Sequence, residues 1–146
     1  MGSAKPPPAD PALWTGLKSP TLAEFEAIAD VAFARLPEGF RDLCAGVILQ
    51  IADFPDDETM DDMELETPFD ILGLFRGMGL PQSPAIAETG QFPNMIWLYR
   101  RPILDYWAEH DETLGKIIAH VLVHEIGHHF GLSDADMERI EAEVAA

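Results

Sequence analysis

The chain has 146 residues, 47% of them hydrophobic, and a formal net charge of −17. This length fits one domain with a real hydrophobic core. The acidic charge argues against nucleic acid and anionic membranes as partners, because both are negatively charged. No apolar run approaches the roughly 18 residues that a membrane span needs. The single cysteine, Cys44, excludes an internal disulfide, and we expect a buried thiol in a cytoplasmic protein.

The N-terminal part divides into a leader and the first helix. Residues 1–20 hold five prolines and predict a flexible leader, followed by a single domain over residues 21–146. Thr21 and Glu24 have the spacing of a capping box, so a helix is expected to begin there. Pro37 is expected to end it.

The middle of the chain reads as strands separated by loops. Three segments are rich in apolar, β-prone residues and predict strands: Val47–Ala52, Phe69–Phe75 and Met95–Tyr99. Gly73, inside the second, indicates a bulge or a close backbone approach. The acidic segment Asp53–Glu66 is predicted to be an exposed loop, and residues 79–93, with three prolines, a second loop.

The last third of the chain is predicted to be helical. A short helix is expected over Pro102–Trp107, then a long, mostly buried helix with Asp111 as its N-cap and Gly131 as its terminator. Ser133 or Asp134 is expected to cap a final helix, whose apolar stripe is Met137, Ile140 and Val144. Helix, strands and helices in this order predict an α+β fold.

The long helix carries the strongest functional signal, the sequence HEIGHHFGLSD at His124–Asp134. His124 and His128 lie one turn apart on one helical face, so two imidazoles can hold one Zn²⁺. Glu125, beside the metal, is placed to act as general base on a water there. We expect His129 to be a surface or supporting residue. His120, one turn before His124, is expected to be an ordinary helix histidine that reaches the site at most from its edge.

A catalytic zinc needs a third protein ligand. Gly131 lets the chain leave the helix sharply, and three residues later Asp134 can swing back beneath the metal. Helix capping is the alternative role for Asp134. We expect Asp136, Glu138 and Glu141 to be poorer candidates, because the last helix should carry them away from the site.

This motif, HExxHxxGxxD, is the extended zinc-binding pattern of zincin-like metallopeptidases. From about Phe25 onward the chain resembles the minimal zincin-like family of small bacterial zinc metallopeptidases. The resemblance implies a small mixed β-sheet packed on a long active-site helix with flanking helices. It also implies that His124, His128 and Asp134 bind the metal and that Glu125 is catalytic. The methionine-containing turn of the larger metzincins has no counterpart here.

Two functions follow as hypotheses. The first is a zinc-dependent metallopeptidase that hydrolyses peptide bonds in a peptide or protein substrate through metal-activated water. The alternative is a zincin-derived binding module with little or no proteolytic activity. The intact Glu125 favours the first hypothesis, because a purely structural metal site needs no base. The small size of the chain favours the second, or a narrow specificity.

Overall fold

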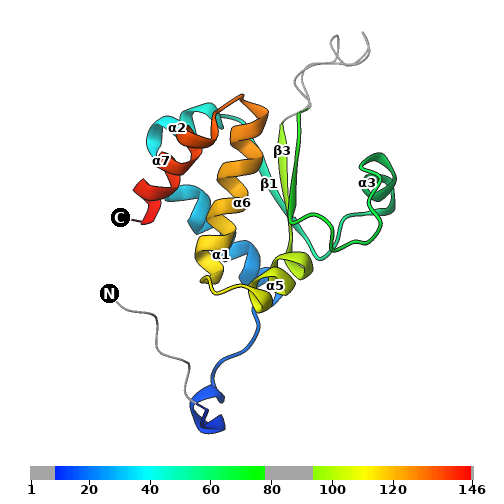
Figure 1. Ribbon diagram of the computed structural model, residues 1–146, viewed down its shortest axis with the longest axis vertical. Coiled ribbons are helices and arrows are strands. Elements are labelled where there is room, and N and C mark those ends of the chain that lie inside the picture. Colours follow the sequence, from blue (N-terminus) through cyan, green and yellow to red (C-terminus); the bar gives the residue numbers. More distant parts are fainter. Residues whose placement is uncertain (1–8, 78–93, 146) are drawn as a thin grey trace.

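The computed structural model describes residues 9–77 and 94–145, so the expected loop over 79–93 lies outside the described residues. One three-stranded mixed sheet has the order β1-β3-β2. Strand β1 (Ile48–Ala52) runs parallel to the central β3 (Met95–Tyr99), and β2 (Gly73–Arg76) runs antiparallel to it. With the helices around this sheet (Figure 1), the predicted α+β class is confirmed.

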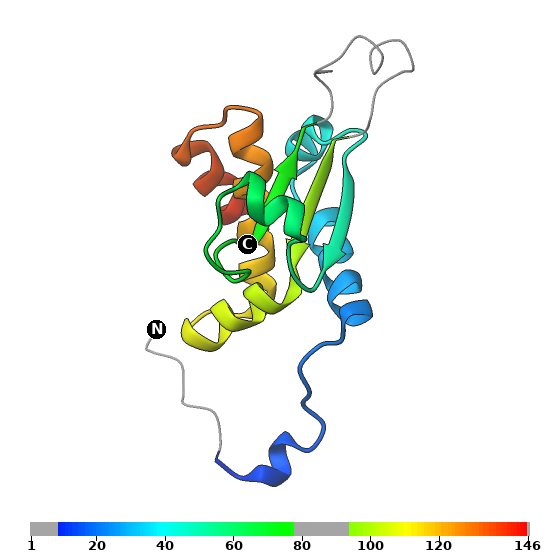
Figure 2. The ribbon, with the colours of Figure 1, turned by 90° about the vertical axis from the view of Figure 1, so that its right-hand side faces the viewer.

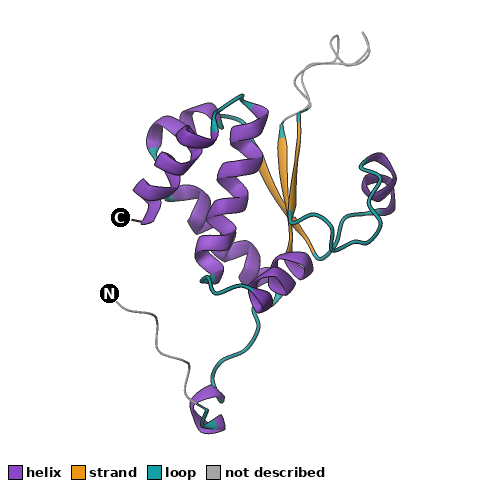
Figure 3. Ribbon diagram, in the orientation of Figure 1, coloured by secondary structure: helices purple, strands orange, loops and turns teal. Residues whose placement is uncertain are grey.

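Helix α6 (Leu114–His129) is the element on which the others pack. It contacts β2 and β3 and also three helices: α1 (Leu22–Ala34), α5 (Arg100–Glu109) and α7 (Asp134–Ala145). Figure 3 shows α1, α6 and α7 on the same side of the sheet. The core face of α6 is fully buried and is formed by Ile118, Leu122, Val123 and Ile126. Burial of these side chains fixes the rotation of α6, and therefore the direction of its polar residues.

Side-chain caps fix where the helices begin. The Thr21 hydroxyl accepts from the Glu24 N–H at 3.1 Å, and the Glu24 carboxylate accepts from the Thr21 N–H at 2.9 Å, which confirms the predicted capping box. The prediction of Asp111 as N-cap of the long helix was wrong. Thr113 is the N-cap, and its hydroxyl accepts from the Lys116 N–H. Helix α7 is capped by Ser133, whose hydroxyl accepts from the Asp136 N–H.

The acidic segment is more ordered than predicted, and its description as a plain loop is corrected. It contains a helical turn and a half, α3 (Asp57–Asp62), with Asp56 as N-cap. Thr59 is only 4% exposed and accepts a hydrogen bond from Arg76 of β2 at 2.7 Å. This bond links the segment to the sheet, and Figure 2 shows α3 in front of the strands.

Two further short helices were not foreseen. A 3-10 turn, η1 (Pro11–Trp14), lies within the predicted leader. Helix α2 (Glu38–Leu43) follows Pro37 and buries Phe40, and Cys44 directly after it is 4% exposed, which confirms the buried thiol.

Gly73 marks a close approach of backbones, as predicted, although its strand begins at this glycine and not at Phe69. A Cβ atom at this position would lie 2.8 Å from the Trp97 carbonyl oxygen and 2.8 Å from a methyl group of Val121. The glycine therefore lets β2 lie close to both β3 and α6. Among the helices of the described residues, none is long and apolar enough to cross a membrane.

Candidate metal centre on helix α6

Three histidines form a stripe along α6, each four residues after the last: His120, His124 and His128. The ring centroids of His120 and His124 lie 4.0 Å apart, and those of His124 and His128 lie 5.7 Å apart. His124 is the middle member and is 24% exposed, while its two neighbours are exposed. The structure therefore places His124 and His128 next to each other on one face of α6, and their role as metal ligands stays a prediction.

Glu125 turns toward the sheet. Its carboxylate accepts a hydrogen bond from the backbone N–H of Phe75 in β2. Burial raises the pKa of the Glu125 carboxyl, and the charges of His128 and His124 together with the Phe75 bond oppose this rise. A carboxylate with a raised pKa is a better proton acceptor near neutral pH than an ordinary surface glutamate. Glu125 is therefore a half-buried carboxylate beside the histidine pair.

Asp134 lies on α7 and not on α6 with His124, Glu125 and His128. It is the first residue of α7 and is exposed, and the capping role that was its alternative belongs to Ser133. Among the residues that the structure describes, one group of potential ligands has its donor atoms within 4.8 Å of one another, and neither Asp134 nor His128 belongs to it. The role of Asp134 as zinc ligand stays a prediction.

The prediction for Glu141 was wrong. We expected α7 to carry Glu141 away from the site, but its carboxylate lies against α6. Oε1 accepts from His120 Nδ1 at 2.6 Å, and Oε2 accepts from His124 Nε2 at 3.1 Å. His120, His124 and Glu141 form the group of potential metal ligands. One carboxylate thus spans two histidines of the stripe.

The turn between α6 and α7 explains this position. Gly131 has a φ of +76°, and the Leu132 N–H donates to the Gly127 carbonyl at 2.9 Å, so the chain reverses directly after α6. Met137 is fully buried, and a Cβ atom at Gly127 would lie 2.6 Å from the Met137 sulfur. In such a reversed pair, four residues forward on α7 correspond to about one turn backward on α6. Glu141 therefore meets His124.

His129 packs against strand β2. This contact fits the supporting role, one of the two roles predicted for it. Its imidazole stacks on Phe75 with ring centroids 4.0 Å apart, and Phe130 packs edge-on against Phe75. The end of α6 is thereby fastened to β2, the same strand that donates a hydrogen bond to Glu125.

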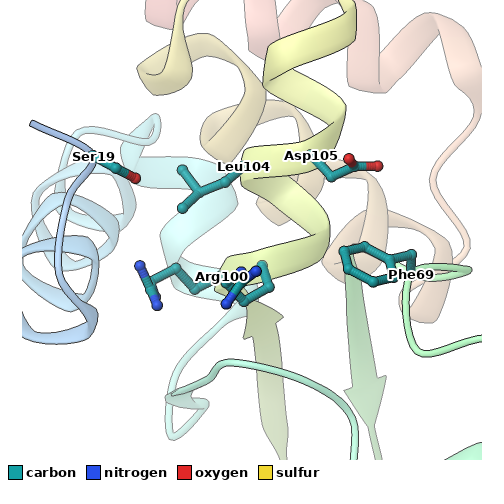
Figure 4. Close-up of a pocket in the computed structure, with 6 residues that line it drawn as sticks. Ser19, Phe69, Arg100, Leu104 and Asp105 are labelled. Atoms are coloured by element: carbon teal, nitrogen blue, oxygen red, sulfur yellow. The ribbon is translucent and has the colours of Figure 1, made fainter.

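A separate hollow of about 480 Å³ lies at the start of α5, lined by Ser19, Phe69, Arg100, Arg101, Leu104 and Asp105 (Figure 4). Arg100 is already committed there, because it donates to the Asp53 carboxylate at 2.6 Å and to the Pro20 carbonyl at 2.8 Å. Arg101 lies over the Phe54 ring. These contacts join the first helix to the sheet, and we read the hollow as structural.

Residues 44–144 match the family model described as zincin-like metallopeptidase, and the chain belongs to this family. A conserved hypothetical protein from Thermus thermophilus shares the fold, with a TM-score of 0.51 and 22% sequence identity. The match covers 76% of this chain and 94% of that one. No curated protein matches the chain significantly.

Family membership implies a metal, usually zinc. The donors on α6 and α7 fit such an ion, since imidazole nitrogen and carboxylate oxygen are both ordinary zinc ligands. His124, Glu125 and His128 are the residues of the HExxH pattern, and Glu125 is half-buried.

Proposed function

We propose that the protein is a zinc-dependent peptidase. His124 and His128 bind the ion, Asp134 is the third ligand, and Glu125 is the general base. The observation that carries the proposal is the setting of Glu125, which is half-buried, lies beside both histidines and is held by the Phe75 N–H. A structural metal site would have no use for such a base.

Strand β2 supports a peptide as the substrate. Within the described residues it pairs with β3 on one side, so its other side is an edge of the sheet. An extended peptide can add to such an edge through backbone hydrogen bonds. Phe75, which donates to Glu125, belongs to this strand. A peptide bound along β2 would therefore lie next to the proposed base.

In the proposed reaction Glu125 takes a proton from the attacking water and passes it to the leaving amine. Zinc, when bound, would lower the pKa of water and polarise the scissile carbonyl. The Phe75 N–H is the backbone group of β2 that faces the Glu125 carboxylate.

The test is a peptide-library cleavage screen of zinc-loaded wild type and Glu125→Gln. We expect the variant to keep its bound zinc and to lose cleavage by about 10²-fold or more, because it lacks the proton acceptor. Glu143→Gln, an exposed α7 position, is the matched control and should cleave like wild type.

Cleavage by Glu125→Gln at the wild-type rate would exclude Glu125 as the base. If zinc-loaded wild type cuts no member of the library, the chain is instead the binding module that the sequence left as the alternative.

A further inference from the structure

We propose that His120, His124 and Glu141 form a second metal site, one turn earlier on α6 than the His124–His128 pair, that binds a divalent transition metal such as Zn²⁺. The inference does not depend on peptide hydrolysis and shares only His124 with the proposed peptidase site. The three donor atoms lie within 4.8 Å of one another.

The two imidazole nitrogens already face the same carboxylate. Two ligands at about 2.0–2.1 Å from a tetrahedral zinc lie roughly 3.3 Å apart. His124 Nε2 and Glu141 Oε2 lie 3.1 Å apart, and His120 Nδ1 and Glu141 Oε1 lie 2.6 Å apart. An ion bound here would replace these two hydrogen bonds, and the atoms that make them would become its ligands.

The three ligands are held by rigid elements. His120 and His124 are one turn apart on the sixteen-residue helix α6, and their rings are already close, with a 31° angle between their planes. Glu141 is fixed by the packing of Met137, one turn before it on α7, against Gly127. A site built on packed helices needs little ordering when the ion binds, which favours affinity.

The site is open to solvent on one side. A groove of about 1240 Å³ runs between α1, α6 and α7, and both His120 and Glu141 line it. His120 is 55% exposed and Glu141 27%. The groove gives an ion a path of entry and leaves room for a water as fourth ligand, the open position that three-ligand zinc sites have.

Because both sites use His124, they cannot both be complete in the same molecule at the same time. His124 Nε2 faces Glu141 in the structure, and one ring nitrogen serves one ion at a time. An ion held by His120, His124 and Glu141 therefore withdraws His124 from His128. Metal bound at the second site would therefore leave the proposed peptidase site without His124.

The test measures Zn²⁺ binding by equilibrium dialysis in a His128→Asn/Asp134→Asn protein, which lacks two of the peptidase ligands but keeps the second site. We expect this parent to bind one Zn²⁺ per chain. Adding Glu141→Gln or His120→Asn should weaken binding by about tenfold or more, whereas adding Glu143→Gln should leave it within about twofold.

Circular dichroism of each metal-free variant checks that it folds, and the Co²⁺ absorption spectrum gives a second readout that should change with Glu141→Gln and not with Glu143→Gln. A parent that binds no Zn²⁺, or one that Glu141→Gln and His120→Asn leave unaffected, overturns the proposal and leaves His120 and Glu141 as an ion pair. The cleavage screen of wild type stands apart from these results, so the two proposals can fail separately.

Discussion

His124 is the α6 histidine of the HExxH pattern that contacts Glu141 of α7. The shared face of His124 and His128 was predictable from the HExxH pattern, because four-residue spacing on a helix fixes which side chains share a face. Glu141 could not be found in this way. Its contact with His124 Nε2, at 3.1 Å, depends on how a second helix packs, and no pattern within α7 reports that.

Cys44 gives a prediction at the same scale. Burial raises the pKa of its thiol to about 11, from an ordinary value of 9.0. A pKa raised on folding contributes stability that is fully present below pH 9 and is lost as the pH rises through 11. We therefore expect the free energy of unfolding to fall by roughly 1–2 kcal/mol between pH 8.5 and 11 because of this thiol.

Urea unfolding of wild type and Cys44→Ala across that pH range measures the effect. The difference between the two proteins should change with pH in the stated direction. A constant difference from pH 8.5 to pH 11 would show that the thiol titrates alike in the folded and unfolded chains.

At the scale of elements, the α6–α7 hairpin decides what the site contains. The sequence predicted its parts correctly: the stop at Gly131, the buried Met137 stripe and a cap at Ser133 as one of two choices. The predicted direction of α7, leading away from the site, was wrong. The reversal at Gly131 sets the two helices side by side, and the buried contact of Met137 with Gly127 then fixes their register.

Gly73 tests how tightly β2 must lie against its neighbours. Gly73→Ala would place a methyl group 2.8 Å from the Trp97 carbonyl oxygen, part of a backbone that cannot move aside cheaply. We expect a loss of about 1–3 kcal/mol in the free energy of unfolding, as for other overpacked core positions. Thermal or urea unfolding measures it.

The control is Gly39→Ala in α2, where a Cβ atom meets nothing within 4 Å. This substitution should leave stability unchanged or raise it slightly, because alanine favours a helix more than glycine does. Equal changes in the free energy of unfolding at the two positions would mean that the close backbone approach at Gly73 does not limit which residue fits there.

At the scale of the whole molecule, the α+β class was predictable because long apolar stripes and β-prone runs identify the main helices and strands. The order β1-β3-β2 was not, since it depends on pairing between segments far apart in the chain. The short helices α2 and α3 were missed for a related reason. Tertiary contacts at Phe40 and Thr59 stabilise them more than any periodic pattern could.

The central claim is that α6 is a metal-binding helix with His124 as a ligand. Anomalous diffraction at the zinc absorption edge, from crystals of wild type grown with equimolar Zn²⁺, tests it most directly. We predict one strong peak about 2.0–2.1 Å from His124 Nε2, with Glu141 or His128 as a neighbouring ligand. A zinc peak that does not touch His124 would contradict it.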